Sequence, residues 1–308
     1  MAQATFLPGY LLVRSRRWAT GQLQTLLLAF GLSLLLNFYL VSILVAMGLY
    51  RTPVMLGIFV LEIILVFCRP RRLNPDPEWC SDLVRLNHFA MDLRQGSWLL
   101  CILRIAVVLW GGVELAKAFR AVFVHWGEIF QVWDEVTSWN RWALDWAGNH
   151  WPERTMSYPQ LLPANLSLTY VFMDTPNIWV FAKGLMPLFP LASLLLMVDL
   201  ALRTRKFVYV LAIPILSLLI NTTIGDVCHL GYAEGPLTFL MTAVLYALLL
   251  AERAPGPAGE GGKLSADVAA LLAAAAALTK TTGWYAVLAC GGLTWWGRRS
   301  EEHTSELQ

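Results

Sequence analysis

Residues 25–50 read TLLLAFGLSLLLNFYLVSILVAMGLY and contain no Asp, Glu, Lys or Arg. An α-helix crosses the hydrocarbon core of a bilayer with about 20 apolar residues, so this stretch alone predicts a transmembrane helix. The rest of the chain is similar: 57% of its residues are hydrophobic, 14% are charged, and the mean hydropathy is +0.56. Soluble domains carry about 25% charged residues. The composition therefore predicts an all-α polytopic membrane protein.

Further apolar segments follow, and together with residues 25–50 they predict eight transmembrane or partly spanning helices, with counts of six or seven left open. The last two segments are short, and we expect re-entrant or broken helices there. The further segments are Val54–Cys68, Trp98–Ala116, Ile178–Asp199, Phe207–Ile224, Pro236–Ala251, Ser265–Leu278 and Gly283–Trp296.

The charges between these helices predict which side each connection faces. With eight spans, one side receives the N-terminal residues, 69–97, 200–206, 252–264 and everything from 298, and these segments hold 15 Lys and Arg residues. The opposite side holds 6, in 51–53, 117–177, 225–235 and 279–282. Basic residues favour the cytoplasm, so both termini are expected inside. The segments 117–177, 225–235 and 279–282 are then expected to meet on the outer face.

The chain divides into three parts on this reading. Residues 1–24 are expected to be a cytoplasmic tail, and 25–297 a membrane domain whose large outward loop spans 117–177. Residues 299–308 read RSEEHTSELQ, which resembles a translated sequencing adapter. We therefore expect 298–308 to be non-native and the domain to be truncated at its C-terminal end.

The outward loop contains the most informative polar stretch, QVWDEVTSWNRWALDWAGNHW at residues 131–151. Two adjacent carboxylates, Asp134 and Glu135, precede a segment with helical spacing, because Trp139, Trp142 and Trp146 share one face. Tryptophan prefers the headgroup level, so this segment is expected to lie parallel to the membrane. The prolines of the next segment, YPQLLPANLSLTY, predict an extended loop over residues 158–170.

These features together resemble the C-type glycosyltransferase superfamily, in particular bacterial protein-mannosyltransferase-like and aminoarabinose-transferase-like enzymes. The resemblance covers residues 98–297. It rests on the acidic pair, the membrane-parallel helix, the YP-x-L-x-P stretch and two later segments, GYAEGPLTF at 231–239 and LTKTTGWY at 278–285. The chain departs from the family where Glu234 stands in place of the usual Asp, and where Thr281 and Thr282 follow the lysine.

The resemblance implies an inverting transferase that moves a sugar from a polyprenyl-phosphate donor to a glycan, lipid or protein acceptor. Such chemistry needs a carboxylate that deprotonates the acceptor hydroxyl, and positive charge beside the departing phosphate. By resemblance, Asp134 is the expected base, with Glu135 as its partner or substitute. The enzyme would act in a bacterial cytoplasmic membrane with its site facing the periplasm or exterior, and the fragment itself could be inactive.

Five further residues are candidate substrate-binding groups. Lys280 is the first choice for the phosphate, because an ammonium between apolar segments needs a partner. Arg141 is weaker because Asp145 could pair with it, and His229 is expected more as a structural residue of a tight loop than as a catalyst. Glu234 and Tyr158 complete the set. The spacing does not decide whether Asp134 and Glu234 hold a divalent metal, no other cofactor is implied, and no nucleic-acid partner is expected.

The main alternative is a secondary transporter or flippase-like carrier of a polar or lipid-linked solute. A carrier is expected to place ionisable residues near the middle of the bilayer and often has two related halves. In this chain the notable acids lie in an outward loop and no internal repeat is evident. The sequence therefore favours the transferase.

Overall fold

The computed structural model describes residues 2–16, 18–68, 78–92, 97–177, 180–251 and 260–293, and every regular element in these ranges is a helix. This confirms the all-α class. The segment expected to be non-native, 298–308, lies outside the described residues.

Five helical segments are long and apolar enough to cross a membrane, which indicates an integral membrane protein. Each has at least 18 residues, and at 1.5 Å per residue that length matches the hydrocarbon thickness of about 30 Å. They are α3 (Gln22–Ala46), α6 (Trp98–Val124), Phe181–Thr204 with α9 (Val180–Lys183) and α10 (Leu188–Thr204), Phe207–Cys228 with α11 (Phe207–Leu219), η2 (Ile220–Ile224) and η3 (Gly225–Cys228), and α12 (Glu234–Ala251).

Shorter helices occupy the other predicted positions, and a further helix lies within the predicted outward loop. The predicted ones are α4 (Thr52–Cys68), α13 (Glu260–Ala277) and a helix over residues 284–293. This further helix is α8 (Leu161–Met173), where the sequence predicts an extended loop. That prediction is wrong because Pro163 lies in the first turn of α8. The first backbone N–H groups of a helix have no intrahelical acceptor, so proline removes no bond there.

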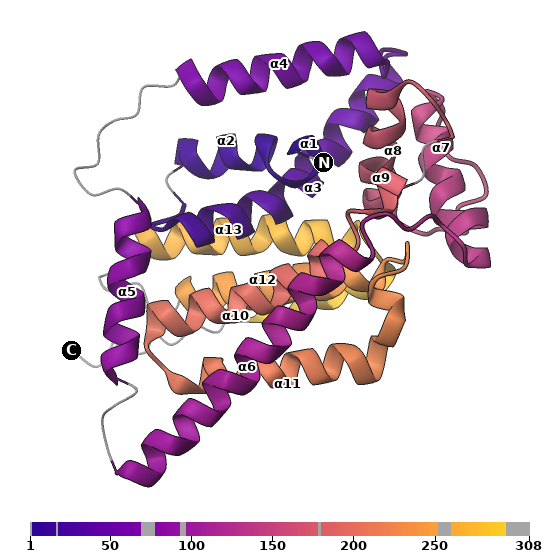
Figure 1. Ribbon diagram of the computed structural model, residues 1–308. Helices are drawn as coiled ribbons and strands as arrows, with labels where there is room; N and C mark the ends of the chain where they lie inside the picture. Colours follow the sequence, from indigo (N-terminus) through magenta and orange to yellow (C-terminus); the bar gives the residue numbers. More distant parts are fainter. Residues whose placement is uncertain are drawn as a thin grey trace.

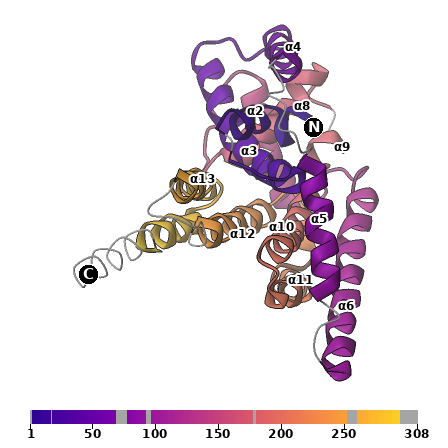
Figure 2. The same cartoon turned by 90° about the vertical axis from the view of Figure 1, so that its left-hand side faces the viewer.

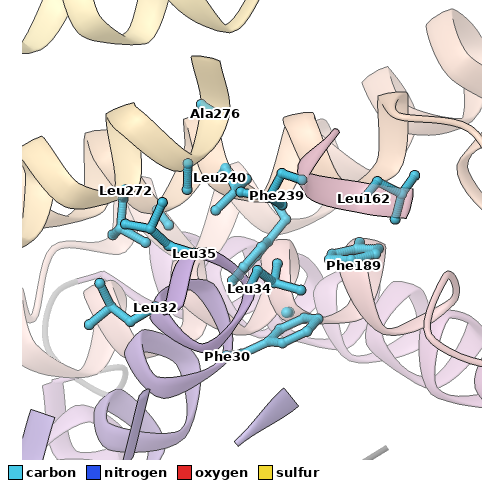
Figure 3. Close-up of a cluster of buried hydrophobic side chains, with 14 of the residues drawn as sticks. Phe30, Leu32, Leu34, Leu35, Leu162, Phe189, Phe239, Leu240, Leu272 and Ala276 are labelled. Atoms are coloured by element: carbon cyan, nitrogen blue, oxygen red, sulfur yellow. The ribbon is translucent and has the colours of Figure 1, made fainter. Parts of the chain in front are cut away.

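Helix α3 runs through the centre of the bundle and packs against α2 (Leu7–Arg16), α8, α10, α12 and α13. Its side chains interdigitate with those of its neighbours (Figure 3). The Phe30 ring lies 5.1 Å from the Phe189 ring and 4.9 Å from the Phe239 ring, measured between centroids. The hydrophobic effect does not drive helices together inside a bilayer, so close van der Waals packing of this kind holds membrane helices to one another. Helices α4 and α6 lie at the periphery (Figure 2). Most of their apolar side chains are exposed.

The N-terminal residues form two helices of the bundle, α1 (Ala2–Thr5) and α2 (Leu7–Arg16), where the sequence predicts a cytoplasmic tail. Helix α2 lies very close to α3. The Gly9 amide donates to Ser33 Oγ at 2.9 Å, and a Cβ at Gly9 would lie 2.1 Å from the Ala29 carbonyl oxygen. Only glycine permits this approach of two backbones.

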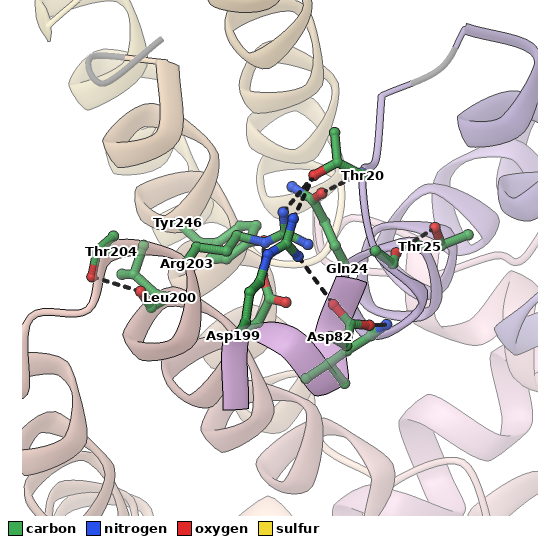
Figure 4. A network of polar contacts seen from close by, with 12 residues as sticks. Thr20, Gln24, Thr25, Asp82, Asp199, Leu200, Arg203, Thr204 and Tyr246 are labelled. Atoms are coloured by element: carbon green, nitrogen blue, oxygen red, sulfur yellow. Dashed lines mark hydrogen bonds and ion pairs between the residues drawn. The ribbon is translucent and has the colours of Figure 1, made fainter. Parts of the chain in front are cut away.

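Helix α5 (Glu78–Asp92) crosses one end of the bundle (Figure 1). The Asp82 carboxylate accepts hydrogen bonds from the Gln22 and Leu23 amides, at 2.9 and 3.3 Å, and so caps α3 from another helix. Beside it, Arg203 Nε donates to buried Asp199 at 2.5 Å, and the Tyr246 hydroxyl donates to the same carboxylate (Figure 4). This network fixes the end that the charge count predicts to be cytoplasmic.

Candidate functional site

The three segments predicted to meet on the outer face come together at the end of the bundle opposite α5. There η1 (Glu135–Asn140) leads into α7 (Arg141–Ala147), which packs against α8 (Figure 1). Glu135 binds the Gly231 amide, and Lys280 binds Glu234. The Leu161 amide also donates to the Leu278 carbonyl at 3.0 Å, which ties the start of α8 to the segment before Lys280.

Glu135 organises this convergence from a fully buried position. Its carboxylate accepts hydrogen bonds from three backbone amides: Gln131 at 2.8 Å, Val132 at 3.1 Å and Gly231 at 2.5 Å. Lys183 Nζ lies 3.4 Å from the same carboxylate. A buried carboxylate bound on all sides holds loops together and has no free oxygen for a substrate. The geometry therefore gives Glu135 a positioning role, where the resemblance implied a partner or substitute for the base.

Gly231 reaches this carboxylate because it has no side chain. A Cβ at Gly231 would lie 2.6 Å from Cε1 of Phe130, a buried residue of the loop that Glu135 closes. A contact under 3.0 Å to a buried aromatic ring requires the ring or the backbone to move. The glycine thus permits the hydrogen bond between its own amide and Glu135.

Lys183 is the cation beneath the site. Only 2% of its side chain is exposed, and its ammonium lies 3.1 Å from the Ile129 carbonyl oxygen, 3.6 Å from Glu128 and 3.4 Å from Glu135. The sequence suggests a side chain at the start of a span that reaches toward the interface. Its inward orientation is set by contacts with residues about fifty positions earlier in the chain. The one sequence signal for a role of Lys183 is its position within an apolar run.

Asp134 differs from its neighbour because its side chain is exposed and makes no hydrogen bond or ion pair within the described part of the chain. The charge of Asp134 acts on Tyr232. Burial raises the pKa of the Tyr232 hydroxyl, and the charges of Asp134, Glu135 and Glu234 raise this pKa further. Three carboxylates therefore act on one surface. Of them, Asp134 is the one that has no hydrogen-bond or ion-pair partner among the described residues.

Lys280 and Glu234 form an ion pair at the edge of this surface, with Nζ 2.5 Å from Oε1. The side chains are 26% and 33% exposed, so an incoming anion can reach the ammonium. Lys280 stands just before η4 (Thr281–Gly283), whose glycine fits tightly, because a Cβ there would lie 1.9 Å from the Ala276 carbonyl oxygen. The pairing also occupies Glu234. No cluster of three or more His, Cys, Asp or Glu side chains suited to a metal ion occurs in the described ranges.

His229 stacks on His125, with ring centroids 4.5 Å apart and planes inclined by 12°. Burial and the neighbouring His125 lower the pKa of His229 to about 4, against the opposing charges of Asp226 and Glu128. His229 is therefore neutral near pH 7 and supplies no positive charge for a phosphate. His125 instead contacts Glu128, with Nδ1 2.9 Å from Oε2.

The three tryptophans of the outward helix face the protein rather than the membrane. Trp139, Trp142 and Trp146 are 4%, 6% and 0% exposed. The prediction of a headgroup position is wrong for these three, because α8 and the helices behind it cover the face they share. Tyr158, which is 41% exposed, contacts Trp139, with 5.8 Å between the ring centroids. Tyr158 is thus an accessible residue in contact with this aromatic cluster, and so is Trp151, which is 55% exposed and lies 4.7 Å from Trp146 between ring centroids.

Arg141 is exposed and makes no ion pair within 4.0 Å in the described chain. Its charge acts on Asp145: burial raises the pKa of that carboxyl, and Arg141 opposes the shift. The predicted neighbours therefore interact through space without forming an ion pair, and Arg141 forms no ion pair with Glu234 either.

Two π-helical turns flank the site. One is η1, which begins at Glu135, and the other is η2, which ends at Ile224 just before the loop that carries His229 and Gly231. Such turns widen a helix by one residue and occur frequently at functional sites. No protein-family model, curated protein or solved structure matches this chain.

Proposed function

We propose that this protein is an integral-membrane glycosyltransferase that moves a sugar from a polyprenyl-phosphate donor to an acceptor hydroxyl. The observation that carries the proposal is the free carboxylate of Asp134, whose charge acts on Tyr232 together with that of Glu234, the partner of Lys280. A base and an accessible cation on one surface are the two groups that this displacement requires.

In the proposed reaction, Asp134 accepts the proton of the acceptor hydroxyl as its oxygen attacks the anomeric carbon. The bond between that carbon and the phosphate oxygen breaks on the opposite face, so the configuration at the carbon inverts. The lipid phosphate leaves with the bonding electrons, and Lys280 exchanges Glu234 for this anion. Because the site lies at the end of a bundle of apolar helices, a polyprenyl chain can remain in the bilayer while its phosphate reaches the surface.

The decisive experiment measures transfer of radiolabelled sugar from polyprenyl phosphate in membrane vesicles of the expressing cells, which supply acceptors. Asp134→Asn should lower transfer by about 100-fold or more, the range of a lost general base. Glu153→Gln, which removes an exposed carboxylate of the same loop, is the matched control and should transfer normally. A fully active, folded Asp134→Asn variant would end the assignment.

One observation favours the carrier as a second candidate. Glu62 lies within apolar helix α4 and its Oε2 atom is buried, as expected for a transporter with ionisable groups inside the membrane. The same vesicles separate the two functions. Label that enters the lumen while still attached to its original carrier, with no covalent transfer in wild type, would establish transport.

A further inference from the structure

A polar cluster joins α1, α3 and α4 inside the otherwise apolar N-terminal half. The side-chain amide of Gln3 donates from Nε2 to Asn37 Oδ1 and to Glu62 Oε1, both at 3.2 Å. Asn37 Nδ2 returns a bond to the Gln3 carbonyl at 2.9 Å. Gln3 and Asn37 are 2% and 0% exposed. The cluster fastens the first helix of the chain to the peripheral helix α4.

Within the described residues, no countercharge accompanies Glu62. Helices α1, α3 and α8 contain no Asp, Glu, Lys or Arg, and Glu62 is the one such residue of α4. The charged residues of α2 are Arg14 and Arg16 in its last turn, beyond the Gly9 contact, and Arg14 binds the Tyr10 hydroxyl. The other titratable groups on these helices are the exposed Tyr39, Cys68 at the end of α4, and Tyr170, which binds Asn140.

Two oxygen atoms of the cluster are left without a donor. Glu62 Oε2 and Gln3 Oε1 are both buried and have no hydrogen-bond partner among the described residues. They belong to the same two groups that already share the Nε2–Oε1 bond. An ionised carboxylate with no cation and an orphaned amide oxygen beside it are each unfavourable in an apolar surrounding.

We propose that Glu62 is a proton-binding site, and that its neutral carboxyl pairs with the Gln3 amide. A proton on Oε2 forms an O–H bond that is directed at Gln3 Oε1, while Gln3 Nε2 continues to donate to Oε1. The two side chains then form the cyclic acid–amide pair in which each supplies one donor and one acceptor. One proton satisfies both orphaned oxygens and removes the uncompensated charge. The proposal does not depend on the sugar transfer.

Loss of this proton would place a carboxylate oxygen against the amide oxygen and weaken the attachment of α1 to α4. Helix α4 has few other buried side chains, since Met55 is the one residue of α4 that is buried. The attachment of α4 is therefore expected to depend on pH through the protonation of the Glu62 carboxyl.

Infrared difference spectroscopy of the full chain in proteoliposomes at pH 7.5 tests the proposal. The spectrum of wild type minus Glu62→Gln should contain the C=O band of one protonated carboxyl, and this band should shift in D₂O. If the difference spectrum instead contains the bands of an ionised carboxylate, Glu62 is not protonated and the proposal is overturned. Carboxylate bands that respond to sodium but not to choline would also overturn it, because they would indicate a metal cation in place of the proton. Glu153→Gln is the control, and should not remove a protonated-carboxyl band.

A second variant keeps the test decisive if Glu62→Gln does not fold. In Gln3→Leu the Glu62 carboxyl loses its amide partner, so the protonated C=O band should move to higher frequency without changing in area. An unchanged band position in folded Gln3→Leu would exclude the acid–amide pair.

Discussion

Glu135 and Gly231 are joined by a backbone amide-to-carboxylate hydrogen bond of 2.5 Å although they lie 96 residues apart in the chain. This bond connects the acidic loop before η1 with the loop before α12. It leaves the adjacent Asp134 exposed at the surface, so the two neighbouring acids have different roles.

Replacing Gly231 with alanine should destabilise the protein. The added Cβ would lie 2.6 Å from the Phe130 ring, and overpacking of this kind costs about 1–3 kcal/mol. Thermal unfolding in detergent measures the effect. Gly127→Ala is the matched control, because a Cβ there meets nothing within 4 Å. Equal melting temperatures for the two variants would contradict the tight fit at Gly231.

Removing the Lys183 ammonium should have a larger effect. Lys183→Met leaves Glu135 buried without its cation, and breaking a buried pair in this way costs about 3–5 kcal/mol. The double variant Lys183→Met with Glu135→Gln should recover part of the loss, because the uncompensated charge is gone. Lys206→Met, at an exposed lysine, serves as the control. If the single variant unfolds like wild type, the buried pair has no structural role.

Lys280→Gln should separate function from stability. The Lys280–Glu234 pair is partly exposed, and such pairs contribute about 0–1 kcal/mol, so the melting temperature should change little. Transfer should fall by about 10-fold or more if the ammonium stabilises the departing phosphate. Transfer assays at several donor concentrations check this. Wild-type transfer in Lys280→Gln would remove this lysine from the site.

Stability should fall on acidification because of His229. Its pKa is lowered to about 4 in the folded protein, below the ordinary value of 6.5, so the unfolded chain binds more protons between these values. The contribution is complete above about pH 6.5 and is lost as the pH falls toward 4. His229→Phe keeps a ring on His125 and should flatten the dependence of melting temperature on pH in this window. Parallel curves for wild type and variant would contradict the shift.

The membrane helices could be predicted from the sequence because their signal is local. Uninterrupted apolar length identifies a span by itself, and alternating sidedness then brings the segments of Glu135, Gly231 and Lys280 to one end. The burial of Trp146 could not be predicted in this way. A tryptophan-rich helical face suits the headgroup region and a protein core equally, and the choice is made by α8, whose prolines had suggested a loop.

The partners of individual polar residues could not be predicted from the sequence either. Neither Lys183 beneath Glu135 nor Gln3 beside Glu62 follows from spacing, since each pair joins elements that are distant in the chain. The packing of α2 on α3 depends on one close backbone contact at Gly9. A single glycine in the sequence does not predict such a contact.

The span of 96 residues between Glu135 and its amide donor Gly231 also has a consequence for biosynthesis. At about 5–20 residues per second, the ribosome needs roughly 5–20 seconds to add the second loop after the first. During that interval the nascent chain carries an acidic loop that nothing yet holds in place, so assembly of this surface must be a late event in membrane insertion.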